Sequence, residues 1–161
     1  MSMDRQQALD ILQMIYTRLV ESQVIWAVTG SLGMALQGME VEVHDIDLQT
    51  DPAGAYEIER LLSKFVTVPV RYVVSKRIRS HLGKLEINGV QVEIIGGVQK
   101  QLGDGSWEEP VRVESYRRWV ELEGMRIPLL SLEYEYQAYL RMGRIEKAEM
   151  IKQWLQKSRL G

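Results

Sequence analysis

The 161-residue sequence contains no cysteine, which excludes disulfide bonds, zinc–thiolate sites and thiol catalysis and suits a reducing compartment. It also has little net charge, because 22 acidic side chains nearly balance 20 basic ones and leave a formal charge of -2. Without a positive field to hold a polyanion, strong nucleic-acid binding is not expected. No apolar run approaches the roughly 20 residues that cross a bilayer, and the start, MSMDRQQALD, has no apolar signal core. We therefore expect a cytoplasmic protein with no membrane segment.

What the chain does contain is an ordinary globular balance, with 45% hydrophobic and 26% charged residues. Its length suits one domain with a sizeable core. We expect a single domain over residues 1–161, with a sheet-containing core over about 1–128 and a helical segment over about 131–158.

Local signals predict the order of the elements. Asp4, followed three residues later by Gln7, marks the start of a helix over about 4–22, and Asp51-Pro52 begins another. This order, with an antiparallel hairpin among the strands, indicates an α+β fold: a mixed β-sheet flanked by helices, with further helices at the C-terminal end. The other predicted elements are strands at 24–29, 43–50, 67–74, 84–87, 90–95, 111–116 and 124–129, a short helix from Gly30 to about Leu36, and two C-terminal helices separated near Gly143.

Two acids stand inside the segment VHDIDLQT, which otherwise has the pattern of a buried strand. A strand over 43–50 places Asp45 and Asp47 on one face, and His44, Ile46 and Leu48 on the other. Two carboxylates on one rigid face repel each other unless a cation lies between them. Oxygen ligands favour Mg²⁺ or Mn²⁺, so we interpret Asp45 and Asp47 as metal ligands.

A calcium loop is the rival interpretation, because acidic and amide side chains alternate from Asp45 to Asp51. Such a loop needs glycine at its sixth position and glutamate at its twelfth. Those positions hold Thr50 and Tyr56, so the calcium loop is excluded.

A third acid lies in a hairpin whose register follows from a two-residue turn at Asn88-Gly89. That register pairs Lys84 with Glu93, with Glu86 and Gln91 on the same face. Glu93 then has two interpretations: a cross-strand ion pair with Lys84, worth about 0.2–1 kcal/mol, or a third carboxylate of the metal site.

Gly30-Ser31 stands where a strand becomes a helix. Glycine permits close backbone approach, and free amides at a helix N-terminus favour phosphate. The alternative is a tight turn in which Ser31 only caps the helix. Two further candidates for phosphate contact are Lys84, in the most basic stretch of the chain, and Arg144, near the C-terminal helices.

Taken together, the glycine-serine turn, the Asp-x-Asp strand and the later acid in VQVEII resemble the nucleotidyltransferase superfamily, above all the small bacterial minimal, lincosamide and aminoglycoside nucleotidyltransferases. The resemblance covers residues 24–49 and extends to the C-terminal helices. It implies that Gly30 and Ser31 hold a nucleoside triphosphate, that Asp45 and Asp47 hold Mg²⁺, and that Glu93 binds a second ion or takes the acceptor's proton.

The implied reaction transfers a nucleoside monophosphate to a hydroxyl of a small-molecule or protein acceptor and releases pyrophosphate. Two departures from the family pattern leave alternatives open: EVEVH precedes the aspartates, and Tyr139 stands where many members have lysine. The alternatives are a non-catalytic nucleotide-binding or antitoxin-like partner protein with the same fold, and a structural protein whose acids are surface groups. A homodimer or a partner protein that completes the cleft is also open.

Overall fold

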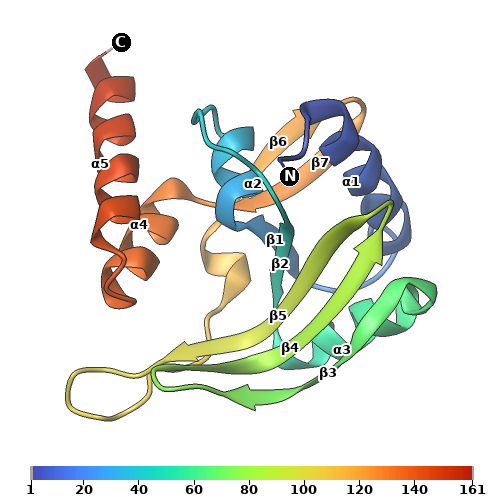
Figure 1. Cartoon of the computed structure of the whole chain (residues 1–161), viewed down its shortest axis with the longest axis horizontal. Coiled ribbons are helices and arrows are strands. Elements are labelled where there is room, and N and C mark those ends of the chain that lie inside the picture. The colour runs from blue at the N-terminus through green and yellow to red at the C-terminus, as the bar shows by residue number, and fades with distance from the viewer. Residues whose placement is uncertain (1, 161) are drawn as a thin grey trace.

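The structure, a computed structural model, describes residues 2–160, with side chains described as far as residue 159. Residues 1 and 161 of the expected domain lie outside the described residues. Figure 1 shows the C-terminal helices at one end of a sheet and the first helix at the other. In chain order the helices and strands are α1 (Arg5–Leu19), β1 (Trp26–Thr29), α2 (Gly30–Leu36), β2 (Ile46–Thr50), α3 (Pro52–Leu61), β3 (Val66–Val74), β4 (Ile78–Ile87), β5 (Val90–Lys100), β6 (Arg117–Leu122), β7 (Met125–Leu130), α4 (Leu132–Arg141) and α5 (Ile145–Leu160).

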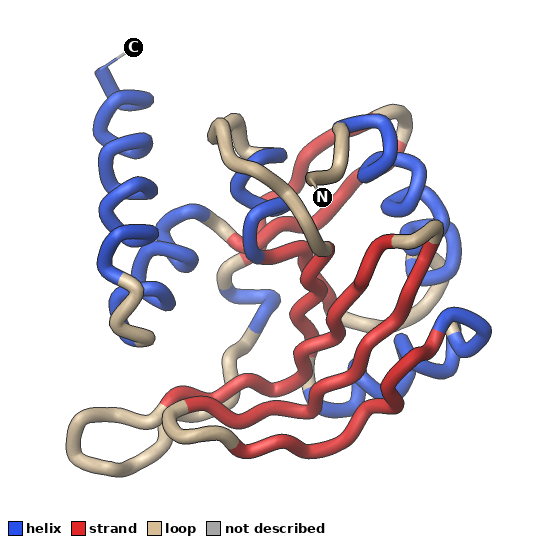
Figure 2. The backbone as a smooth tube through the Cα atoms, viewed as in Figure 1, coloured by secondary structure: helices blue, strands red, loops and turns tan. Residues whose placement is uncertain are grey.

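The strands form one seven-stranded sheet in the order β3-β4-β5-β2-β1-β7-β6, visible as a continuous twisted surface in Figure 2. It is mixed, because β2 runs parallel to β5 and β1 parallel to β7, while the other neighbouring pairs are antiparallel. The predicted α+β fold, with a mixed sheet and C-terminal helices, is confirmed.

Several local predictions are confirmed in detail. The Asp4 carboxylate accepts a hydrogen bond from the Gln7 N–H at the start of α1, and Asp51 caps α3 through the Gly54 N–H. Asn88 and Gly89 both have positive φ, at 50° and 79°, which is the conformation that a two-residue hairpin turn requires. Because the turn fixes the register, the predicted pairing of β4 with β5 is also correct.

The two faces of the sheet differ in what covers them. On one face α1 and α3 pack over the largest apolar cluster, which includes Val28, Leu48 and Ile94. On the opposite face Ala27 and Leu130 pack against α4 in a smaller cluster. A third cluster joins α2, α4 and α5. No helix among residues 2–160 is long and apolar enough to cross a membrane.

Two strand predictions need correction. β2 begins at Ile46 and not at residue 43, because β1 ends at Thr29, opposite Asp47, and residues 43–45 pair with neither β1 nor β5. Residues 111–116 are not a strand; they contain a short 3₁₀ helix at Val113–Ser115. The strand follows this helix as β6, in which Arg117–Leu122 pair with β7.

Shortening a buried side chain of β2 tests the assignment of the core. Leu48→Ala should lower the free energy of unfolding by about 2–5 kcal/mol, because Leu48 is fully buried at the centre of the sheet. The control is Leu102→Ala, a change of the same size at a residue that is 42% exposed, which should cost less than about 0.5 kcal/mol. Urea denaturation measures both; equal losses would contradict the assignment of the core.

Candidate active site

Four polar side chains form a row across four adjacent strands, on the face opposite the main core. Thr29 of β1 is paired with Asp47 of β2, Asp47 with Glu93 of β5, and Glu93 with Lys84 of β4. Neighbours in such a row lie about 5 Å apart at Cα. Because Leu48 and its neighbours fix the strands from the other face, the two acids cannot separate without disturbing the core. We call these four residues the polar row.

Gly30 begins α2 at the end of this row, and its φ of +71° lies in the left-handed region. A Cβ atom at Gly30 would lie 2.5 Å from Oδ2 of Asp47. The position therefore requires glycine twice, for its backbone conformation and for the close approach of a carboxylate. The turn expected to hold phosphate and the acid expected to hold metal are in direct contact.

Asp47 sits in an environment that disfavours its charge. Burial raises its pKa to about 7, the charges of Glu93 and Asp45 contribute to the rise, and Lys147 opposes them. A buried carboxyl whose charge is disfavoured by neighbouring acids is a candidate for a functional site, because a cation would stabilise its charged form.

Glu93 shares that environment. Burial raises its pKa, the ammonium of Lys84 lowers it, and Asp45 raises it. The ion pairs found in the described chain do not include one between Lys84 and Glu93, so the direct cross-strand ion pair is not formed. Lys84 still acts on Glu93 through its charge, and the role of Glu93 in a metal site stays a prediction.

Asp45 lies in the bend before β2 and is exposed, so the prediction that it shares a strand with Asp47 is wrong. It is nevertheless close enough for its charge to raise the pKa of both Asp47 and Glu93. Among the residues from 2 to 160, no three acidic or histidine side chains are placed to hold one metal ion. The three acids are coupled electrostatically without forming a closed set of ligands.

Glu135 of α4 is a fourth acid, which the sequence analysis did not single out. It is only 4% exposed, and its Oε1 accepts hydrogen bonds from the Thr29 hydroxyl and, at 3.2 Å, from the Gly30 N–H. Burial raises its pKa to about 7, while Thr29 and Gly30 lower it by hydrogen bonding. The Gly30 amide, expected to contact phosphate, therefore already has a partner within the chain.

Two cations from the C-terminal segment approach the same place. The guanidinium of Arg144 and the ammonium of Lys147 lie 5.2 and 5.5 Å from the centre of the Tyr139 ring. Burial lowers the pKa of Lys147, as does Arg144, whereas Asp47 and Glu135 raise it. Tyr139 thus has two cations over its ring.

A cavity of about 210 Å³ lies between the polar row and α4. It brings together four of the expected residues: Gly30, Asp47, Glu93 and Arg144. Ser31 lines a neighbouring cavity of about 290 Å³, together with Lys147. Asp45 and Lys84 line neither of these two cavities. Ser31 is also not the cap of α2, because Thr29 occupies that position.

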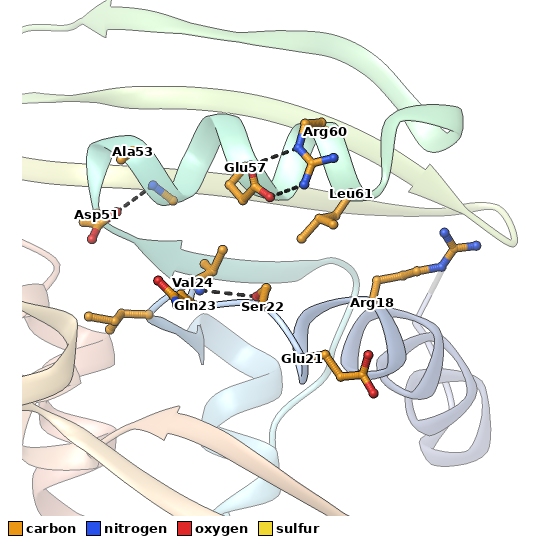
Figure 3. A pocket seen from close by; sticks show the side chains of 12 residues that line it. Arg18, Glu21, Ser22, Gln23, Val24, Asp51, Ala53, Glu57, Arg60 and Leu61 are labelled. Atoms are coloured by element: carbon orange, nitrogen blue, oxygen red, sulfur yellow. Dashed lines mark hydrogen bonds and ion pairs between the residues drawn. The ribbon is translucent and has the colours of Figure 1, made fainter.

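A larger cavity, of about 670 Å³, lies at the other end of β1 and β2 and is shown in Figure 3. Two of its acids already have partners: Asp51 accepts from the Gly54 N–H, and Glu57 forms an ion pair with Arg60. It holds no cluster of buried acids with raised pKa values among its described residues, so we assign the site to the polar row.

Gly30 provides a direct test of the contact with Asp47. Gly30→Ala should lower the free energy of unfolding by about 1–3 kcal/mol, because it adds left-handed strain and a clash with the carboxylate. Gly103→Ala is the matched control, since a Cβ there meets no described atom within 4 Å, and it should be neutral. Thermal and urea unfolding measure both; a neutral Gly30→Ala would contradict the geometry.

The raised pKa of Asp47 predicts a defined pH dependence. The pKa of Asp47 is about 7 in the folded protein, against an ordinary value of 3.8 for an aspartate. The protonated carboxyl therefore contributes its full share to the free energy of unfolding below about pH 4. That stability is lost as the pH rises toward 7. Asp47→Asn cannot ionise and should be more stable than the parent at pH 8 without divalent cations, by on the order of 1–3 kcal/mol.

The two proteins should have similar stability at pH 4, and urea denaturation across this range measures the difference. Glu86→Gln, at an exposed acid of β4, is the control and should follow the parent curve. An Asp47→Asn protein no more stable than the parent at pH 8 would contradict the raised pKa.

Comparison with known proteins identifies the family. The chain matches the family model described as aminoglycoside-2''-adenylyltransferase over residues 11–152. It is 56% identical to TM1012, a Thermotoga maritima protein assigned to the nucleotidyltransferases, whose crystal structure superposes with a TM-score of 0.85 over 97% of each chain. A comparison with curated protein sequences gave no match.

Two other solved structures share the fold at low identity. LnuA, a lincosamide antibiotic adenylyltransferase bound to lincomycin, has a TM-score of 0.53 at 16% identity, over 83% of this chain and 84% of that one. ANT(2'')-Ia, in complex with adenylyl-2''-tobramycin, has a TM-score of 0.59 at 13% identity, over 92% and 89% of the two chains. Because the family model matches most of its length, this protein belongs to the aminoglycoside-2''-adenylyltransferase family and is a nucleotidyltransferase.

Proposed function

We propose that this nucleotidyltransferase acts with Mg²⁺, moving a nucleoside monophosphate from a nucleoside triphosphate to a hydroxyl of its acceptor. The observation that carries the proposal is the contact of Asp47 with Gly30, beside Glu93 in the polar row. It combines buried acids with a glycine turn at a helix start, the two parts needed to hold a metal and a triphosphate.

The triphosphate would be held by Gly30 and Ser31 at the start of α2, with Lys84 and Arg144 supplying positive charge. Arg144 lines the cavity beside the polar row, and Ser31 lines the neighbouring one. Since the Gly30 N–H is bonded to Glu135, Ser31 would supply the main contact from the turn itself. Lys84 would act at longer range, from the end of the polar row.

Asp45, Asp47 and Glu93 are the proposed metal ligands, and their chemistry fits Mg²⁺ or Mn²⁺. All three offer oxygen atoms, and the mutual charge effects that raise the pKa values of Asp47 and Glu93 are those a cation relieves. When bound, the ion supplies charge neutralisation to the phosphates and to the attacking oxygen.

Glu93 is the proposed general base. The acceptor's hydroxyl oxygen forms a bond to the α-phosphorus while the bond from that phosphorus to the β-phosphate's bridging oxygen breaks. Pyrophosphate leaves with the electron pair, and Glu93 receives the hydroxyl proton. Burial raises the pKa of Glu93, which makes it a stronger base near neutral pH than an exposed glutamate.

The first acceptors to test follow from the structural neighbours. LnuA was solved with lincomycin and ANT(2'')-Ia with adenylylated tobramycin, so ATP with hydroxyl-bearing antibiotics of these two classes is the first choice. The cytoplasmic location and any second subunit stay predictions.

A second candidate function is nucleotide binding without transfer, as in an antitoxin-like partner protein. One observation favours it, the hydrogen bond of the Gly30 N–H to Glu135, and so does the sequence expectation that Tyr139 stands where many family members have lysine. Calorimetry separates the two functions, since tight binding of ATP without turnover over a broad acceptor panel supports the second.

The proposed reaction predicts Mg²⁺-dependent release of pyrophosphate from ATP in the presence of an acceptor. Asp47→Asn should abolish it, and Glu93→Gln should lower kcat by about 10²–10⁴-fold because the proton loses its base. Chelation with EDTA should stop the reaction, and added Mg²⁺ should restore it.

Glu86→Gln is the matched control for Glu93→Gln, because Glu86 lies on the partner strand of the same hairpin but is exposed. Its rate should stay within about twofold of the parent. Turnover that survives Asp47→Asn would contradict the mechanism.

A further inference from the structure

The contact between Glu135 and the turn at Gly30 joins parts of the chain that are far apart in sequence. Gly30 and Glu135 are 105 residues apart, and Thr29 and Glu135 are 106 apart. One carboxylate oxygen accepts from both donors, the Thr29 hydroxyl and the Gly30 N–H. The last residue of β1 and the first residue of α2 are thus held by a helix from the C-terminal segment.

This contact replaces the usual local support of a helix start. A threonine at the cap position normally accepts a hydrogen bond from an amide in the first turn of its own helix. Thr29 is the cap of α2, but within the described chain its side chain makes no such bond and donates instead to Glu135. The conformation of the Gly30 turn therefore depends on α4.

The same turn determines where Asp47 lies. A Cβ at Gly30 would meet Oδ2 of Asp47 at 2.5 Å, so the carboxylate rests against the Gly30 backbone. A shift of Gly30 would change the space available to that carboxylate. The chain of contacts runs from Glu135 through Gly30 to Asp47.

Packing alone does not explain an acid at this position. Leu132, Ala138 and Tyr139 share the buried side of α4 with Glu135, and burial raises the pKa of Glu135. An apolar residue of similar size would avoid the cost of burying a carboxyl group. Glu135 provides a hydrogen-bond acceptor for the turn, which an apolar side chain cannot do.

We propose that Glu135 is a positioning residue, which accepts hydrogen bonds from Thr29 and Gly30 and so holds the turn against which the catalytic Asp47 is placed. The inference rests on the proposed function for its effect on catalysis, but its effect on the turn stands on the contacts alone. It makes α4 part of the active site, since Glu135 lines the same cavity as Gly30 and Asp47.

The test compares two variants at Glu135 in the full chain. Glu135→Ala removes the acceptor, whereas Glu135→Gln keeps a carbonyl oxygen that can accept from both donors. Glu133→Ala and Glu133→Gln are matched controls, since Glu133 is exposed two residues earlier on the same helix. Thr29→Val and Thr29→Ser test the other partner in the same way, and they remain informative if Glu135→Ala does not fold.

Two readouts are needed. Amide hydrogen exchange by NMR reports on the turn: exchange at Gly30 should rise by about tenfold or more in Glu135→Ala and stay near the parent in the Glu133 variants. Steady-state kinetics with ATP and Mg²⁺ give kcat and KM for the transfer reaction. In Glu135→Ala kcat should fall by about tenfold or more, while KM for ATP changes by less than about threefold, because misplacement of Asp47 affects the reaction more than binding.

Glu135→Gln and Thr29→Ser should recover most of both properties. The inference is overturned if Gly30 exchange in Glu135→Ala matches the parent, if the Glu133 variants lose as much, or if glutamine and alanine at position 135 are equally impaired. If the parent shows no turnover with any acceptor, the proposed function fails, and Gly30 exchange still decides whether Glu135 holds the turn.

Discussion

Two carboxyl groups are forced side by side by the sheet, and the rest of the site depends on that constraint. Asp47 and Glu93 occupy paired positions on parallel strands, and their strands are held in register by buried residues on the opposite face, such as Leu48 and Ile94. Burial raises the pKa of both acids, the charge of Glu93 raises that of Asp47 further, and the charge of Asp45 raises both. Packing of the core therefore keeps the carboxyl groups close together, an arrangement that a bound cation would stabilise.

The residues around these acids come from two separate parts of the chain. Residues 29–93 supply the glycine turn and the whole polar row, and α4, α5 and the residues between them supply Glu135, Arg144 and Lys147 on the other side. Two cations, Arg144 and Lys147, lie over the ring of Tyr139. Positive charge is therefore present near the turn, although it comes from α5 and the residues before it.

Sequence reasoning succeeded where local chemistry decides the structure. The turn at Asn88-Gly89 fixes the hairpin register, so the pairing of Lys84 with Glu93 could be deduced from the sequence. It failed at Asp45, because the length of β2 depends on where its partner strands begin, which the segment itself does not encode. Glu135 was missed for a similar reason: its role depends on a contact across 105 residues. Its only local signal was an acid on the apolar stripe of α4.

The central claim is that the acids of the polar row and the Gly30-Ser31 turn form one site for a metal and a triphosphate. The most direct measurement is a crystal structure of the protein with Mg²⁺ and a nonhydrolysable ATP analogue. We expect metal density bound by Asp45, Asp47 and Glu93, and phosphate oxygens against Ser31. A nucleotide bound in the cavity beside Asp51 and Arg60, at the other end of β1 and β2, would contradict it.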